Sequence, residues 1–500
     1  MEIDHIQLKN INRRSVLNYI RKNGSATKAG LASATGLTFA AIKKILDELE
    51  SMKLVRCSGV EKSGLGRNSV VYEINGDYGY IVSVYVNRKA IHVAVVNVRG
   101  VIISKQKLPM ENRELTQQEL IEDILQSVRE VIRESGIAEH KFIGLGLGVP
   151  GPIDLERGLI LTPPNMPVLR YLPMREILEA KLALPVYLHK DTNVLALGEY
   201  WHGCHNSEHS LVYLDVDMGL GTGMILNGKI HVGADGKAGE YGHVTIDPHG
   251  PLCKCGNHGC LEAMGSGLAV LRDFREQLEA LPEHPLYQKR NDLVIADVIG
   301  AIQSNDMTAI SIVNQAAYNV GIGVANLINF LDPEVVVLGG LCIRNFRGMF
   351  DIISNVARER IMKNNLAGNI VRSQLGMDAG VVGCAGQGPD PYRLTEELVQ
   401  AALESQGRLH ALRKNKTFPR MFEYFGWCTW DAFYHKVNEK DILAKLEEFR
   451  QKDVPLGWLL IDDGWSDADY ETKRLNSLGA APEKFPQGIG HTARVAKEQY

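Results

Sequence analysis

The stretch CKCGNHGCLE, residues 253–262, places three cysteines within eight positions and ends on a glutamate. Cys253, Cys255 and Cys260 have the spacing of a compact thiolate cluster, and His243 lies ten residues before the first of them. Three thiolates and one imidazole complete a tetrahedral shell, which is the usual composition of structural rather than catalytic zinc sites. The sequence therefore predicts a structural zinc ion, and the alternative is three free cysteines in a loop.

Length and composition describe a soluble chain of several domains. A chain of 500 residues indicates roughly two to four domains, and 45% hydrophobic with 23% charged residues is typical of globular proteins. Apolar runs are too short to span a membrane, and the N-terminus lacks the apolar core of a signal peptide. We therefore expect a cytoplasmic protein without membrane contact, in which the cysteines are thiols or metal ligands rather than disulfides.

The charge is distributed unevenly along the chain. Residues 1–67 hold twelve Lys/Arg and six Asp/Glu, a balance of +6, whereas the whole chain carries −4, so the remainder carries −10. A basic module attached to an acidic body indicates a polyanionic partner for the N-terminal part. A solvated cationic face is the alternative.

Apolar spacing within the basic module predicts a helix over residues 11–22 and a short second helix that breaks at Gly36. Thr38 is suited to cap a third helix. The buried stripe of that helix is expected to consist of Ile42, Ile45, Leu46 and Leu49. Residues 54–75 read as two strands around a Gly-rich turn. Together these elements predict a winged helix-turn-helix domain over residues 1–75.

The N-terminal end of the second helix of such a motif enters the major groove of DNA. The residues expected to contact operator DNA are Thr38, Phe39, Lys43 and Lys44 of that helix and Arg67 of the wing. The acidic residues of the helix fall at its far end, away from the phosphates. The alternative is a three-helix packing unit with no role in DNA binding.

From about residue 78, strand and helix patterns alternate, which indicates an α/β fold. Three motifs precede the cysteine cluster in order: GVPGPID at 148–154, DTNVLALGE at 191–199 and GEYGH at 239–243. Through these motifs, residues 11 to about 385 resemble the ROK family of sugar kinases and sugar-responsive transcriptional regulators. The resemblance implies two actin-like ATPase (ribonuclease H-like) lobes over residues 76–388, with a sugar site between them.

The resemblance also assigns roles to particular side chains. It implies sugar contacts at five positions, Asn165, Asp191, Glu240, His243 and Glu262, and it makes His243 the fourth zinc ligand. Carboxylates accept hydrogen bonds from vicinal hydroxyls, so this set suits a sugar. In the family's kinases the residue matching Asp191 is the general base. Here Lys190 stands where the family usually has Asn.

The turn that would bind ATP phosphate departs from the kinase pattern. The family's kinases have Asp-x-Gly-Gly-Thr where this chain has the residues 85–89, YVNRK, so both glycines are replaced. Close approach of backbone to phosphate depends on glycine at such turns. We therefore expect a regulator without kinase activity, a homodimer or tetramer in which a sugar effector changes operator affinity, most simply as a repressor. An ATP-dependent ROK sugar kinase is the alternative.

Residues 389–500 differ in character and hold four of the five tryptophans. Through GWCTWDAFY and LLIDDGW they resemble the raffinose synthase and alkaline α-galactosidase family, which implies the first strands of a (β/α)₈ barrel. The matching sugar contacts are Trp430, Asp431, Asp462 and Asp463. A complete barrel takes about 250 residues, so we expect no glycosidase or galactosyl transferase chemistry here. We interpret the segment as a fused neighbouring gene or a truncated reading frame, and the alternative is a glycosidase that continues beyond Tyr500.

Overall fold

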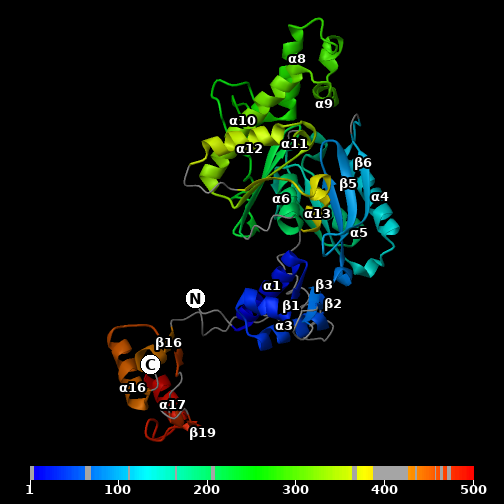
Figure 1. Cartoon of the computed structure of the whole chain (residues 1–500). Helices are drawn as coiled ribbons and strands as arrows, with labels where there is room; N and C mark the ends of the chain where they lie inside the picture. Colours follow the sequence, from blue (N-terminus) through cyan, green and yellow to red (C-terminus); the bar gives the residue numbers. More distant parts are fainter. Residues whose placement is uncertain are drawn as a thin grey trace. The chain divides into compact units, whose positions relative to one another are not determined.

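The computed structural model describes residues 5–61, 69–110, 113–163, 166–203, 209–362, 369–386, 426–433, 436–456, 458–461, 465–469 and 474–499 (Figure 1). The chain divides into two compact units, Met1–Leu394 and Thr395–Tyr500, which are described separately. Within these described ranges, no helix combines the length and apolarity needed to cross a membrane.

The N-terminal part of the first unit is a winged helix-turn-helix. Its elements are α1 (His5–Asn23), β1 (Ser25–Thr27), α2 (Lys28–Thr35), α3 (Phe39–Ser51), β2 (Val55–Glu61) and β3 (Ser69–Ile74). The sheet has the order β1-β3-β2 and is antiparallel. Strand β1 adds to the predicted elements, because three residues are too short to show a strand pattern in the sequence.

The predicted break at Gly36, the cap at Thr38 and the buried stripe are confirmed, whereas α1 begins at His5, before the predicted start at residue 11. The Thr27 hydroxyl accepts from Gly30 N and starts α2, Gly36 ends it in the left-handed region at φ +69°, and the Thr38 hydroxyl accepts from Ala41 N and starts α3. The core of this domain is formed by Val16, Ile20, Ala26, Leu31, Ile42, Ile45, Leu46, Leu49, Val55 and Tyr72. The stripe of α3 therefore faces this core, which leaves the opposite side of α3 free for another molecule.

Lobe I is built on a mixed sheet of order β10-β7-β4-β5-β6. Its strands are β4 (Tyr80–Val86), β5 (Ala90–Asn97), β6 (Ile102–Pro109), β7 (Phe142–Val149) and β10 (Val186–Lys190), with helices α4 (Gln117–Ser135) and α5 (Met174–Leu182) and the small ladder β8 (Ile153–Asp154) and β9 (Leu159–Ile160). Strands β4, β5 and β6 are antiparallel, and β7 and β10 join in parallel.

Lobe II repeats this topology with the order β13-β12-β11-β14-β15. Its strands are β11 (Ser210–Val216), β12 (Leu220–Leu226), β13 (Lys229–Ile230), β14 (Val335–Gly339) and β15 (Asn369–Arg372). Its helices are α7 (Leu261–Gly265), α8 (Gly267–Glu279), α9 (Ile295–Gln303), α10 (Met307–Leu331), α11 (Leu341–Asn345) and α12 (Met349–Arg360). Three antiparallel strands flanked by two parallel strands, found twice, form the two-lobed architecture that the sequence predicted.

Helices α6 (Asp191–His202) and α13 (Ala379–Ala385) lie between the two sheets (Figure 1). Alternate residues of the central strands point to them: Tyr85 of β4 and Tyr213 of β11 share one buried cluster with Val194 of α6 and Ala379 of α13. The opposite face of each sheet packs against a helix of its own lobe. In lobe I this helix is α4, and in lobe II it is α10. Helix α6 is therefore in contact with both lobes.

The second unit contains a β-α-β element. Strand β16 (Gly426–Cys428) pairs in parallel with β17 (Trp458–Leu460), with α15 (Trp430–Phe433) and α16 (Glu439–Gln451) between them in sequence. A hairpin of β18 (Ser466–Asp469) and β19 (Arg474–Ala480) and the helix α17 (Ile489–Gln499) follow. The core contains Val437, Ile442, Leu446, Phe485 and Ala496. The parallel pair β16–β17 with helices between its strands agrees with the first strands of a (β/α)₈ barrel that the resemblance implied.

Candidate metal centre, pocket and nucleic-acid interface

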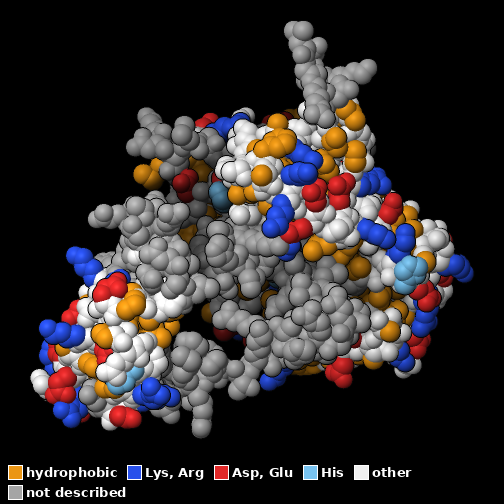
Figure 2. Space-filling model, turned by 90° about the horizontal axis from the view of Figure 1, so that it is seen from below, with side chains coloured by type: hydrophobic (Ala, Val, Ile, Leu, Met, Phe, Trp, Pro, Cys, Tyr) orange, Lys and Arg blue, Asp and Glu red, His pale blue; other side chains and the backbone are white. Residues whose placement is uncertain are grey.

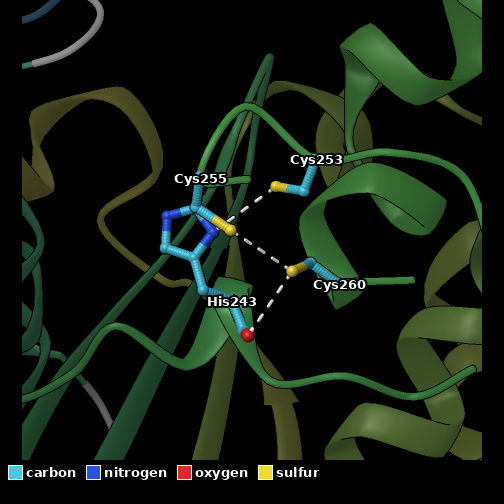
Figure 3. Close-up of side chains that lie close together, drawn as sticks. All are labelled: His243, Cys253, Cys255 and Cys260. Carbon is cyan, nitrogen blue, oxygen red and sulfur yellow. Dashed lines mark hydrogen bonds between the residues drawn. The ribbon is translucent and has the colours of Figure 1, made fainter. Parts of the chain in front are cut away.

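The predicted zinc ligands come together in one cluster (Figure 3). One ligand atom from each of His243, Cys253, Cys255 and Cys260 lies within 4.8 Å of all the others. The Cys253 sulfur is 3.6 Å from His243 Nδ1, and the sulfurs of Cys255 and Cys260 are 3.6 Å apart. A tetrahedral zinc ion with Zn–S bonds of about 2.3 Å holds its ligands about 3.5–3.8 Å apart. The donor set and its spacing therefore fit zinc.

The backbone around the cluster is folded tightly. Gly259 has φ +62°, and a Cβ there would lie 1.5 Å from the Asp247 carbonyl oxygen, so only glycine fits. Ile246 N donates to the Gly259 carbonyl, and this contact brings the segment after His243 against the cysteine loop. Burial raises the pKa of the Cys260 thiol to about 12 and also raises the pKa of Cys253. Their thiolate forms thus require a cation, which the predicted zinc supplies.

The carboxylates predicted to contact sugar lie at element ends near this cluster. Asp191 is the first residue of α6, Glu240 precedes the short helix η4 (Tyr241–His243), and Glu262 is in the first turn of α7. Glu262 Oε2 accepts from Leu220 N at 3.0 Å, so one of its oxygens is committed to the start of β12. Asn165 lies outside the described residues. The roles of these side chains in sugar binding remain predictions.

Asp191 has a perturbed carboxyl group. Its Oδ1 accepts from Thr192 N at 2.7 Å, and burial raises its pKa to about 6, while Lys190 opposes the rise and Glu240 adds to it. A carboxyl group in such an environment is a candidate for a functional role. The Thr192 hydroxyl donates to the Thr222 carbonyl of β12 at 3.0 Å, which ties the first turn of α6 to lobe II.

The turn between β4 and β5 is held by contacts of its own side chains. Asn87 Oδ1 accepts from Lys89 N at 2.9 Å and from Ala90 N at 3.0 Å, so the turn is closed on its own side chain. Lys89 Nζ faces Asp217 Oδ1 of the β11–β12 turn at 4.0 Å. Tyr85, which stands at the kinase aspartate position, packs its ring against Gly380. Asn87, which stands at the position of the first kinase glycine, thus closes the turn with its side chain, and Lys89 pairs with Asp217.

The start of α3 presents the predicted DNA-contacting residues to solvent. Thr38, Lys43 and Lys44 are exposed, and the exposed fraction of Phe39 is 58%. The acidic end of α3 is partly neutralised, because Arg13 Nε donates to Glu48 Oε2 at 2.9 Å. Arg67 lies outside the described residues. DNA contact by these side chains remains a prediction.

Basic side chains are mixed with acidic ones elsewhere. On the face of the molecule in Figure 2, the described Lys and Arg side chains alternate with Asp and Glu, with small hydrophobic groups between them. A mixed surface of this kind gives no strong field of one sign.

Sequence reasoning missed a contact between α1 and α6. The Arg21 guanidinium stacks on the Trp201 ring at 3.7 Å and donates to the Trp201 carbonyl oxygen at 2.9 Å. Burial lowers the pKa of Arg21 to about 10. Nearby, Glu73 of β3 accepts from Arg99 of the β5–β6 turn at 3.2 Å. The winged helix is thereby linked to the body of the first unit, and no local pattern signals these partners.

In the second unit, Trp430 and Asp431 lie in the short helix α15, which follows the β16 strand as the resemblance implied. Asp462 and Asp463 lie outside the described residues. Contact of these four residues with a sugar remains a prediction.

Comparison with known proteins agrees with this division of the chain. Residues 9–56 match the winged helix-turn-helix DNA-binding family, residues 81–386 match the ROK family, and residues 381–494 match the family of raffinose synthase or seed imbibition protein Sip1. The xylose repressor of Caldicellulosiruptor bescii is 32% identical over 338 residues, which cover 67% of this chain and 84% of the repressor. A glucokinase of Halalkalibacterium halodurans is 32% identical over 309 residues, 61% of this chain and 93% of the kinase.

Among solved structures, a ROK family transcriptional regulator, a homologue of the Escherichia coli MLC protein, matches with a TM-score of 0.62 and 25% identity. The match covers 76% of this chain and 95% of that regulator, so it includes residues beyond the two lobes. The family match over the lobes, the preceding winged helix and the likeness to whole regulators agree. This chain therefore belongs to the ROK family.

Proposed function

We propose that this protein is a sugar-responsive DNA-binding transcriptional repressor of carbohydrate-utilisation genes that acts in the cytoplasm. The observation that carries the proposal is the winged helix on a ROK body: α3 exposes Lys43 and Lys44 at its N-terminal end, where a recognition helix meets DNA. Two relatives are named xylose repressors, and this chain matches most of the length of each. They support the same function.

The effector is a small sugar, and D-xylose is the first candidate because of the names of those relatives. In this proposal, sugar hydroxyls donate to Asp191, Glu240 and Glu262, and the side chain of Asn165 completes the site. Zinc, when bound, neutralises the thiolates and fixes the segment that carries Glu240 and His243. The metal has a structural role, because its four protein ligands leave no open position for a reaction.

Helix α6 is the proposed route from the pocket to the DNA-binding domain. It begins at Asp191 in the pocket and ends near Trp201, whose ring and carbonyl oxygen are held by Arg21 of α1. In between, the buried Glu199 accepts from the Ser373 hydroxyl at 2.6 Å and from Leu375 N at 3.0 Å. A sugar that changes the closure of the lobes thus acts on a helix held by both lobes and by the winged helix.

Operator binding by a dimer or tetramer with two winged helices is part of the proposal, because paired half-sites need paired recognition helices. The test begins with selection of binding sequences from random DNA by the full chain. We expect a palindromic site, bound less tightly as salt increases and released by D-xylose or another aldose. A chain that lacks residues 1–75 and binds the selected site equally well would refute the DNA-binding role.

Kinase activity is the second candidate, because a glucokinase shares 32% identity with the chain. The closed turn at Asn87 and the Lys89–Asp217 pair argue against it. We expect no ADP formation above background with D-glucose or D-xylose and ATP in a coupled assay. Turnover that is lost in Asp191→Asn would instead assign the kinase reaction to this pocket.

A further inference from the structure

The side chain of Lys190 connects the two lobes beside the proposed pocket. Lys190 is the last residue of β10 in lobe I, and its Nζ lies 2.5 Å from Oε1 of Glu240, which follows β13 in lobe II. The exposed fractions of the two side chains are 12% for Lys190 and 54% for Glu240. The ammonium group is therefore enclosed, whereas the carboxylate is accessible from solvent.

The backbone on both sides holds this pair in place. A Cβ at Gly151 would lie 3.5 Å from Lys190 Cγ and Cδ, so the aliphatic part of Lys190 runs along the GVPGPID turn. Gly239 has φ +84°, and a Cβ there would lie 2.6 Å from the Thr222 carbonyl oxygen. Glycine is needed at this point, and it sets the direction in which the next residue, Glu240, leaves the chain.

The charges around this pair are predominantly negative. Asp191 follows Lys190 directly in the sequence, and Glu240 accepts a hydrogen bond from the Lys190 ammonium group. Glu262 accepts a hydrogen bond from Leu220 N at the start of β12. The carboxylates of Asp191 and Glu240 thus both act on the ammonium group of Lys190, which is already paired with Glu240. A neutral polyol offers hydroxyls that donate to carboxylates and accept from an ammonium group. A sugar acid or sugar phosphate would add a further negative charge to the same group of carboxylates.

We propose that Lys190 and Glu240 form an interlobe ion pair that selects an uncharged monosaccharide, whose hydroxyls replace the ion-pair contact, and rejects sugar acids and sugar phosphates. This inference rests on the proposed function, since it assigns the ligand class of the same pocket. Lys190 acts here as a specificity residue: it compensates Glu240 in the empty pocket and donates to a hydroxyl in the occupied one.

The test measures dissociation constants of the full-length, zinc-loaded protein for D-xylose, D-glucose and D-galactose, and for D-glucuronate, D-galacturonate and the hexose 6-phosphates. Calorimetry or tryptophan fluorescence serves as readout. We expect a neutral aldose to bind at least tenfold more tightly than any of the anions. In Glu240→Gln, Lys190 loses its partner, so this preference for the neutral sugar should fall at least fivefold. In Lys190→Gln, the cation that faces Asp191 and Glu240 is gone, so the preference should rise.

Zinc content and thermal unfolding of both variants check that the pocket is intact, and either variant alone keeps the test decisive if the other does not fold. Anion binding as tight as that of the neutral sugars, or a preference that stays within twofold in both variants, overturns the inference while sugar response stands. If the protein binds its operator but none of these sugars, the inference falls together with the sugar-responsive part of the proposed function.

Discussion

Replacement of Arg21 by Ala should uncouple sugar binding from DNA binding. The guanidinium group joins α1 to the end of α6 through a ring stack at 3.7 Å and a hydrogen bond of 2.9 Å to the Trp201 carbonyl oxygen. A hydrogen bond from a charged donor contributes about 1.5–3 kcal/mol. A cation–π contact removed from water contributes about 1–2 kcal/mol. The hydrogen bond and the cation–π contact of Arg21 together stabilise the link between α1 and α6 by about 2.5–5 kcal/mol.

Burial opposes this contact. It lowers the pKa of Arg21 to about 10 from an ordinary value of 12.5, which corresponds to about 3 kcal/mol against the charged form. The net contribution of Arg21 is therefore roughly 0–2 kcal/mol, comparable to the coupling energies of about 1–3 kcal/mol that link sites in allosteric proteins. A contact of this size can form or break when a sugar binds, without large cost to the stability of the protein.

The assay is fluorescence anisotropy with the selected operator, with and without saturating sugar, together with calorimetry of sugar binding to the free protein. In Arg21→Ala we expect the ratio of operator affinities without and with sugar to fall toward one by about fivefold, the equivalent of the middle of that range of roughly 0–2 kcal/mol, and by no more than about 30-fold. Sugar affinity of the free protein should change less than threefold. Lys53→Ala removes one exposed positive charge from the same domain, and this control should lower operator affinity in both states equally. An unchanged ratio in Arg21→Ala would refute the role of this contact.

Four further outcomes test the remaining parts of the proposal. Lys43→Ala and Lys44→Ala should each weaken operator binding about 3–30-fold and reduce the slope of log affinity against log salt by about 0.9, as measured by titration at several salt concentrations; an unchanged slope would exclude phosphate contact. Cys255→Ser should lose zinc, measured by metal analysis, and with it the sugar response, so that a full response without zinc would contradict the structural role. Sugar affinity should fall as pH drops through about 6, because the carboxyl group of Asp191 becomes protonated there, and calorimetry should show no such step in Asp191→Asn. The raised pKa of this group means that it destabilises the folded state above pH 6 by up to about 3 kcal/mol. Asp191→Asn should therefore raise the free energy of unfolding at pH 7, measured by denaturant titration without sugar, and a decrease in stability would contradict this.

Local sequence signals predicted much of the architecture. Thr38 as a cap, Gly36 as a helix end and the stripe on α3 define the helix-turn-helix, because capping and amphipathic spacing act over a few residues. Short apolar runs rich in β-branched residues and tyrosine likewise indicated β4, β5 and β11. The cysteine cluster was predictable because three of its four ligands lie within eight residues, and the altered phosphate turn was visible as YVNRK in place of glycines.

The tertiary structure alone decided which distant side chains meet. Arg21 and Trp201 are 180 residues apart, Glu199 and Ser373 are 174 apart, and Lys190 and Glu240 are 50 apart. Nothing in the neighbourhood of any of these residues encodes its partner, since the contact arises when two sheets and a helix pack together. The substitution of Lys at position 190 was visible in the sequence, but its ion pair across the lobes was not. The sequence by itself thus determined most of the elements, the cluster of one histidine and three cysteines, and the family, whereas the contacts that would couple pocket and DNA-binding domain depend on long-range packing.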